Sequence, residues 1–348
     1  MKVEIGNLDT RKLAYNETYA WTSTLLKSLR NSMDLFKFDE IVPTPFSRRY
    51  EPGAKHSVIV LGDKTLPNIR ENGNLASSSN SKVEVAGEQY YYMSVSHVVE
   101  KQMATEYLPK VYCLAPCLRL LMEGEELSAK HIYSFFQFEI EWRTEKMEEV
   151  FDLGEKILYE AGNKILSLID NNDNLTLTPL AQRNTESLVK GSYPRITFEE
   201  ALERVGRSKD SEGDLTSEED ALLSNQFDTP FWIYNYPAGV RDSIYHESPK
   251  GVFQTYDLML PFGYGELTTG GIRPTSGEEI INQSKTLGNS YHPEYAQWKD
   301  KSQVQTAGFG IGLERLLKFI SGAESILDFI QYHDAGPNTT ITRPINQK

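Results

Sequence analysis

Glycine and arginine stand close together near the carboxyl-terminal end of the sequence, in the segment GFGIGLERLL. Gly308, Gly310 and Gly312 carry no side chain and therefore let a backbone approach a phosphate closely. Arg315 follows just inside a predicted helix, where its guanidinium can hold a phosphate through paired hydrogen bonds. The spacing matches neither the GxGxxG dinucleotide fingerprint nor the GxxxxGK phosphate loop. The segment therefore predicts a glycine turn entering a helix, which either binds a phosphate or packs closely on a sheet.

Two acidic residues bracket a predicted hairpin. Asp257 and Glu266 flank the segment DLMLPFGYGE, and the surrounding sequence predicts two strands joined at a Pro and Gly turn. Carboxylates brought together at one end of a sheet suit a hard divalent cation that bridges nucleotide phosphates, although two surface acids would give the same pattern. Arg273 follows a pair of glycines, where a cationic fork can lie beside a bound carboxylate.

Residues 131–143 alternate with a period of two. The apolar positions, interrupted only by Ser134, are Ile132, Phe136, Phe138, Ile140 and Trp142. The positions between them are His131, Tyr133, Phe135, Gln137, Glu139, Glu141 and Arg143. This pattern predicts a strand with a core face and a polar face. A polar face is most often solvated, but this mixture of imidazole, aromatic, amide and carboxylate groups also suits the floor of a ligand pocket.

Composition limits the classes of function. The 348 residues carry 36 Lys and Arg against 49 Asp and Glu, a formal charge of −13, and no run of basic residues. This balance argues against a nucleic-acid binder, which needs a cationic face. With 39% apolar and 24% charged residues the chain is long enough for one or two globular domains. Neither a signal peptide nor a membrane-spanning run is found, so we expect a cytoplasmic protein.

The two cysteines, Cys113 and Cys117, lie four residues apart in the apolar segment VYCLAPCLRL. In an extended strand such positions are about 13 Å apart, which is too far for a disulfide. The six histidines form no HxxxH pair and the sequence has no CxxC. We therefore expect no ligand set for a structural zinc or redox site.

Helical and extended patterns follow one another without regular βαβ alternation, which predicts an α+β architecture with an antiparallel sheet covered by helices. Ser96 is expected to cap the helix of SHVVEKQMATEYL. The predicted elements are a helix over 12–36, a proline-bearing strand over 38–46, an exposed loop over 70–82, a strand at YYYMSV, the helix after Ser96, and a helix over 145–170. A mixed insertion with an acidic, solvated loop is expected at about 171–236.

Three of these segments, in order, resemble the signature motifs of class II aminoacyl-tRNA synthetases. They are FDEIVPTPF, then VYCLAPCLRLL with KHIYSFFQFEIEW, and GFGIGLERLL. DLMLPFGYGELTTGGIR is similar to the asparaginyl branch of the aspartyl and asparaginyl subgroup, as are YPRITFEEAL and FWIYNYP. The resemblance covers about residues 38–322. It implies a class II synthetase-like sheet flanked by helices, one catalytic domain over 1–348, and a homodimer formed through the first motif.

The resemblance also implies roles for individual residues, with ATP and Mg²⁺ as cofactors. Arg119 would hold the α-phosphate, Phe135 would stack on adenine, and His131 with Arg315 would contact the γ-phosphate. Asp257 and Glu266 would hold magnesium. The residues implied for the amino-acid pocket are Ser96, Lys101, Gln137, Glu139 and Arg273. The sequence departs from the family pattern at Leu121, Ser134 and Val98, which alters the contacts to adenine and to the substrate amino group.

Lys101 and Arg273 bear on the choice of substrate, because buried cations need partners and two of them predict a dianionic acid such as aspartate. Only 37 residues precede Phe38, too few for the anticodon-binding barrel of this subgroup, so no tRNA partner is expected. The segment SHVVEKQMA is similar to the helix that carries the substrate lysine in archaeal-type asparagine synthetase, which makes asparagine from aspartate, ATP and ammonia. The expected function is therefore an asparagine synthetase-like ligase that activates aspartate or a close acidic analogue as an acyl-adenylate, releases pyrophosphate and transfers the acyl group to ammonia. Two alternatives stay open: a specialised ligase that passes an aspartate-like acid to another amine, and a non-catalytic synthetase paralogue.

Overall fold

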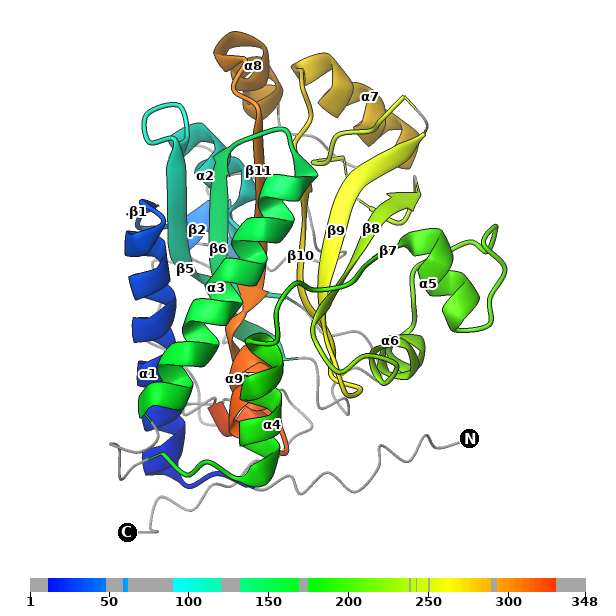
Figure 1. The fold of residues 1–348 in the computed structure, drawn as a ribbon. Coiled ribbons are helices and arrows are strands. Elements are labelled where there is room, and N and C mark those ends of the chain that lie inside the picture. The colour runs from blue at the N-terminus through cyan, green and yellow to red at the C-terminus, as the bar shows by residue number, and fades with distance from the viewer. Residues whose placement is uncertain are drawn as a thin grey trace, which may run out of the picture.

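The computed structural model describes residues 12–47, 59–61, 90–119, 132–168, 175–237, 239–241, 243–249, 251–288 and 293–329. Among these, an eight-stranded sheet runs through the centre of the molecule (Figure 1). Its strands in spatial order are β1 (Asp39–Glu40), β5 (Lys110–Leu118), β6 (Ser134–Arg143), β11 (Thr306–Gly312), β10 (Gly265–Ile272), β9 (Val252–Leu260), β8 (Phe231–Pro237) and β7 (Arg195–Thr197). A smaller sheet contains β2 (Phe46–Ser47), β4 (Tyr90–Met93) and β3 (Ile59–Leu61).

The large sheet is antiparallel from β5 to β8 and parallel only at its two edges, where β1 pairs with β5 and β7 with β8. The α+β architecture predicted from the sequence is therefore confirmed. β9 and β10 form the predicted hairpin, and a bulge between Glu266 and Thr268 shifts their register near the turn. β6 and β11 are neighbours, which brings two of the predicted motifs side by side.

Helices cover both faces of this sheet. On one face, α1 (Tyr15–Leu35), α3 (Met147–Leu168), α4 (Pro179–Leu188) and α9 (Leu313–Ser321) pack together over the apolar side of β6 (Figure 1). On the other, α2 (Val98–Ala104), α7 (Gly277–Leu287) and α8 (Pro293–Ser302) share a smaller apolar cluster of Val99, Ile280 and Tyr295. The short 3₁₀ helix η3 (Ile326–Phe329) packs on α9. In the described part of the chain, no helix has both the length and the apolar character that crossing a membrane requires.

The helices predicted over 12–36 and 145–170 are confirmed as α1 and α3. The strand predicted over 38–46 is not continuous: β1 ends at Glu40 and β2 begins only at Phe46. Pro43 and Pro45 lie in the gap, and because proline lacks an amide hydrogen it cannot continue a strand ladder. The loop predicted over 70–82 lies outside the described residues.

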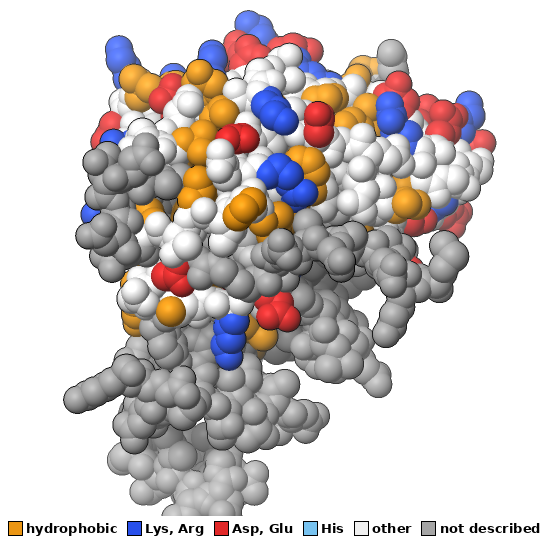
Figure 2. Space-filling view, turned by 60° about the horizontal axis from the view of Figure 1, so that its bottom comes forward, with side chains coloured by type: hydrophobic (Ala, Val, Ile, Leu, Met, Phe, Trp, Pro, Cys, Tyr) orange, Lys and Arg blue, Asp and Glu red, His pale blue; other side chains and the backbone are white. Residues whose placement is uncertain are grey.

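The segment expected as an insertion at 171–236 contributes two strands, β7 and β8, to the large sheet, and its helix α4 packs on α3 and α9. Its other helices, α5 (Phe198–Arg204) and α6 (Ser217–Ser224), cover β8 and the end of the hairpin. The acidic stretch between them is largely exposed. Figure 2 shows Asp and Glu side chains gathered on that side of the molecule, with Lys and Arg among them.

The glycines of GFGIG lie in the central strand β11 and not in a turn, which corrects the sequence-based prediction. A side chain at Gly308 would collide with the Glu141 carboxylate and the Ile140 carbonyl of the neighbouring strand. A Cβ at Gly310 would meet nothing closer than 3.4 Å, at the Gln137 side chain. Position 308 therefore requires glycine because the Glu141 side chain and the β6 backbone approach it closely, and not because of turn geometry.

This difference gives a stability prediction. We expect Gly308→Ala to lower the free energy of unfolding by about 2 kcal/mol or more, because the added methyl group forces the β6 backbone or Glu141 to move. The matched variant Gly310→Ala should change it by less than about 1 kcal/mol, since ordinary contact distances are available there. Urea unfolding followed by circular dichroism measures both. Losses of equal size in the two variants would contradict this explanation.

Candidate active site

The polar side of β6 faces α2 and is buried toward the carboxyl-terminal end of the strand. Glu139 and Glu141 are almost completely inaccessible, although a polar strand face is usually solvated. Gln137, one alternation earlier, is half-buried. Carboxylates are buried only when cations or hydrogen-bond donors compensate them, so each of these glutamates needs partners from the neighbouring elements.

Lys101 of α2 is the partner of Glu139, with 2.8 Å between Nζ and Oε2. The main-chain amide of His97 donates to both oxygens of the same carboxylate at 3.2 Å. Burial would raise the pKa of Glu139, but the Lys101 charge and the His97 contacts outweigh it and hold that pKa well below its usual range. Residue 97 is the N-cap of α2 and no side chain caps the helix, so the predicted capping role of Ser96 is wrong. The Glu139 carboxylate lies at this helix start instead, and Ser96 is buried just before it.

Arg273 is the partner of Glu141, and the pair is bidentate. Arg273 Nε donates to Oε1 at 3.0 Å and Nη2 to Oε2 at 2.7 Å, while the Thr306 hydroxyl donates to Oε1 at 2.7 Å. The Glu141 charge holds the pKa of Arg273 above its usual value despite burial. One donor group of this guanidinium, Nη1, is buried without a partner among the described residues.

These two ion pairs change the electrostatic character of the predicted pocket. Lys101 and Arg273 each face a buried carboxylate, so their charges are compensated before any ligand arrives. Glu139 was expected in the pocket from the sequence, but nothing in a single sequence pairs Glu139 with Lys101 or Glu141 with Arg273. A surplus of positive charge, the basis for predicting a dianionic acid, is absent from these two pairs.

Arginines and an acid meet at the other end of the same strands. Arg119, at the end of β5, donates through Nε and Nη2 to the Val95 carbonyl at 3.3 and 3.1 Å, and its guanidinium lies 5.1 Å from the centre of the Phe135 ring. Arg315 of α9 donates through Nη1 to the side chain and main chain of Glu266, at 2.9 and 3.0 Å. Burial would raise the pKa of Glu266, but Arg315, then Arg241 and, most weakly, Arg119 lower it, so three guanidinium groups act on this carboxylate. His131 and Leu121 lie outside the described residues.

Asp257 is held by partners that the sequence did not suggest. Its Oδ2 accepts hydrogen bonds from the Tyr236 hydroxyl and from Arg241 Nη2, both at 2.5 Å, and Arg241 reaches on to Asp214. Its Oδ1 is buried and has no partner among the described residues. Burial raises the pKa of Asp257 to about 6, and the charge of Glu266 adds to this shift although Arg241 opposes it. The two carboxylates are thus close enough to repel, as expected of residues that share a cation.

Glu314 is a further site residue that sequence reasoning did not assign. It precedes Arg315 in α9, and its carboxylate accepts the main-chain amide of Phe136 at 3.1 and 3.2 Å. This contact fixes β6 beside the Phe135 ring and ties it to the helix that carries Arg315. Burial raises the pKa of Glu314 to about 7.

The shifted pKa of Glu314 predicts how stability depends on pH. Because the folded-state value of about 7 exceeds the ordinary 4.5, the folded chain binds a proton that the unfolded chain has released within this window. The unfolding free energy of the unmodified protein should therefore fall, relative to that of Glu314→Gln, as pH rises from about 4.5 to about 7. The relative loss should reach at most about 3 kcal/mol.

Urea unfolding at several pH values measures this difference. Glu203→Gln, on the exposed face of α5, is the control and should follow the unmodified protein at every pH. Parallel curves for Glu314→Gln and the unmodified protein would contradict the assignment.

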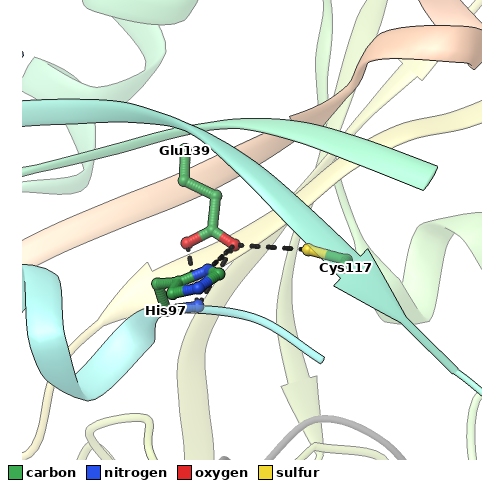
Figure 3. A group of neighbouring side chains, drawn as sticks. All are labelled: His97, Cys117 and Glu139. Carbon is green, nitrogen blue, oxygen red and sulfur yellow. Dashed lines mark hydrogen bonds and ion pairs between the residues drawn. The ribbon is translucent and has the colours of Figure 1, made fainter. Parts of the chain in front are cut away.

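His97, Cys117 and Glu139 come together beside Lys101, a grouping that the sequence gave no reason to expect (Figure 3). Cys113 and Cys117 are both free and buried, in agreement with the predicted absence of a disulfide between them. The expectation that no zinc ligand set exists rested on spacing along the chain. The structure assembles these three residues from three separate segments instead, so sequence spacing could not find them.

Solved structures share this fold. Asparaginyl-tRNA synthetase from Pyrococcus horikoshii, complexed with asparaginyl-adenylate, aligns with a TM-score of 0.73 at 21% identity, over 90% of this chain and 67% of that one. The Entamoeba histolytica enzyme in complex with asparaginyl-adenylate aligns with a TM-score of 0.70 at 14% identity, over 94% and 73%. The antiparallel sheet and its helices are thus those of a class II aminoacyl-tRNA synthetase.

Sequence similarity identifies the family. The model of "tRNA synthetases class II (D, K and N)" matches residues 1–335, and the chain belongs to this family. Asparagine–tRNA ligase from Pyrococcus furiosus is 26% identical over 262 residues, covering 72% of this chain and 57% of that protein. The Thermoplasma acidophilum ligase is 25% identical over 260 residues, covering 72% and 58%. The chain thus spans a little over half the length of these relatives.

The expectation that no tRNA takes part is wrong, because the relatives are ligases of asparagine and tRNA. The argument rested partly on the formal charge of −13. A net charge averages over the whole surface, whereas contact with RNA depends on the local charge and shape of one face.

Proposed function

We propose that this protein is an ATP-dependent ligase that activates the carboxylate of asparagine as an acyl-adenylate and transfers the acyl group to tRNA. The observation that carries the proposal is the convergence of Arg119, Phe135, Glu266 and Arg315 at one end of the sheet. Adenylation joins a carboxylate oxygen to the α-phosphorus of ATP and expels pyrophosphate. It needs alignment and charge compensation and no side-chain nucleophile, which two guanidinium groups and a cation can supply.

The phosphate end of the proposed site follows from these residues. Arg119 would hold the α-phosphate, Arg315 the γ-phosphate, and Phe135 would stack on adenine. Asp257 and Glu266 would hold Mg²⁺, which neutralises phosphate charge when it is bound. The unpartnered Asp257 Oδ1 and the repulsion between the two carboxylates support this assignment.

Charge compensation in the pocket supports asparagine over aspartate. Lys101 and Arg273 already face Glu139 and Glu141, so a second carboxylate on the substrate would add an anion without a free counter-charge. A neutral amide can be held by single hydrogen bonds, and Arg273 Nη1, which has no partner among the described residues, is available for one. The complexes of two similar proteins with asparaginyl-adenylate agree with this choice.

A second candidate function is amide formation from aspartate and ammonia. Lys101 favours it, because a fully buried lysine beside the pocket can exchange its partner Glu139 for a substrate carboxylate. The two candidates share the adenylation step and differ in the acid and in the acceptor.

One assay separates them. Exchange of labelled pyrophosphate into ATP is measured with magnesium and either asparagine or aspartate, and the products formed with tRNA or with ammonium are identified by mass spectrometry. Exchange with asparagine and acylation of tRNA would support the proposal. Exchange with aspartate, followed by asparagine formation only with ammonium, would replace it with the second candidate. Absence of exchange with both acids would contradict both.

Arg315→Ala should lower the rate of pyrophosphate exchange by roughly 10²- to 10³-fold, as does the loss of one donor to transition-state charge in other enzymes. Arg195→Ala is the matched control, because this arginine is also paired with carboxylates and is 34% exposed compared with 32% for Arg315. It should retain full exchange activity. An equal loss in both variants would indicate general damage to the fold and remove Arg315 from its assigned role.

The homodimer implied by the resemblance is also a proposal. The end of α1 and the segment after β1 support it, since Leu35 is 60% exposed and Val42 91% exposed on either side of the edge strand β1 in the sequence. Exposed apolar residues at a sheet edge are typical of an interface between chains. We expect a dimer by size-exclusion chromatography with light scattering, and a monomer for Val42→Asp. Leu222→Asp, at an exposed apolar position of α6, should stay dimeric, and a monomeric unmodified protein would overturn the proposal.

A further inference from the structure

Three side chains with metal-ligating atoms converge on one buried point next to α2 (Figure 3). His97 comes from the start of that helix, Cys117 from β5 and Glu139 from β6, and all three are buried. Their nitrogen, sulfur and oxygen atoms lie within 4.8 Å of one another. We propose that they form a binding site for a transition-metal dication, with zinc as the ion that best fits the ligands.

The two separations from Glu139 are close to those around a small tetrahedral ion. Glu139 Oε1 lies 3.8 Å from His97 Nδ1 and 3.9 Å from Cys117 Sγ. Zinc bonds of about 2.0–2.3 Å to nitrogen, oxygen and sulfur place neighbouring ligand atoms of a tetrahedron about 3.3–3.7 Å apart. Contractions of a few tenths of an ångström bring these two separations to that range.

The orientation of the His97 ring prepares it for coordination. Nε2 lies 3.0 Å from the Thr44 carbonyl oxygen, which can only accept, so Nε2 carries the proton. In the neutral ring the other nitrogen, Nδ1, presents its lone pair to the cluster, where it is buried without a hydrogen-bond partner among the described residues. Histidines that bind metals are oriented in this way, with the second ring nitrogen donating to a carbonyl or carboxylate.

Direct pairing of the imidazole with the carboxylate accounts less well for this arrangement. The separation of 3.8 Å between Nδ1 and Oε1 is too long for a hydrogen bond, so protonation of Nδ1 would not by itself satisfy this nitrogen. A metal ion between the two atoms uses both lone pairs. Lys101 holds the other carboxylate oxygen, Oε2, at 2.8 Å and thereby leaves Oε1 directed at the cluster.

The ligand chemistry favours zinc over magnesium. One imidazole, one thiol and one carboxylate form a mixed set that a borderline-soft ion accepts, whereas magnesium requires oxygen ligands as at Asp257 and Glu266. Binding would convert the Cys117 thiol to a thiolate–zinc bond and release its proton to solvent. Thiolate and carboxylate then place two negative charges beside the ion, and the cluster together with Lys101 carries one net positive charge. Three protein ligands leave the fourth position for an exchangeable water molecule.

Metal content tests this proposal independently of ATP chemistry. The full chain is stripped with a chelator and titrated with Zn²⁺, and bound zinc is counted by mass spectrometry. Titration with Co²⁺ gives a thiolate-to-cobalt charge-transfer band when a cysteine is a ligand. We expect one zinc ion per chain and this band in the unmodified protein.

Cysteine variants provide the matched comparison. Cys117→Ala should weaken zinc binding at least about 100-fold and abolish the cobalt band. Cys113→Ala removes the other buried thiol from the same side of β5 and should keep both. An unmodified protein without stoichiometric zinc and without the band would overturn the proposal, even where a variant fails to fold. So would a Cys113→Ala protein that loses zinc as completely as Cys117→Ala.

Discussion

Two buried carboxylates on one face of one strand constrain the part of the molecule that we propose to bind the amino acid. Glu139 and Glu141 are two residues apart in β6, so both point to the same face, and neither reaches water. An uncompensated charge there would cost several kcal/mol, which is why each glutamate has its own cation. Lys101 fixes the distance of α2 from the sheet, and Arg273 fixes the end of β10. The placement of α2 and β10 against β6 therefore follows from charge pairing as much as from apolar packing.

The end of the sheet that we propose to hold the phosphates is organised differently. The Arg119 and Arg315 guanidinium groups are only partly buried, and their partners are main-chain carbonyls and the Glu266 carboxylate, which the proposed nucleotide would displace or share. Glu314 and Arg315 are adjacent in α9, and they act in opposite directions: one holds the β6 backbone while the other extends toward Glu266. A single helix start thus couples the position of the strand to that of a ligand-binding side chain.

Much of this arrangement could be predicted from the sequence, and the failures have physical causes. The period of two in residues 131–143 predicted which side chains share a face, and the spacing of apolar residues predicted α1 and α3. Phe136, predicted for the core face, is 41% exposed, although the Glu314 side chain of α9 contacts its main-chain amide. Ion-pair partners such as Glu141 for Arg273 lie more than a hundred positions apart, and no local pattern assigns them. The metal-ligand group at His97 was missed for the same reason, since alternation places Cys117 on a face but does not say what lies opposite.

The absence of a side chain at Gly308 limits which substitutions this protein can accept during evolution. The Glu141 carboxylate occupies the space above that glycine, and the same carboxylate holds Arg273. We therefore expect the residues at positions 141, 273 and 308 to change together during evolution, although they lie in or next to three different strands. Replacing Arg273 to alter substrate choice would leave the buried Glu141 carboxylate without its counter-charge unless residue 141 also changed. A shorter residue at position 141 would in turn leave space for a side chain at position 308. Substitutions in this part of the sheet should be found together in descendants and rarely alone.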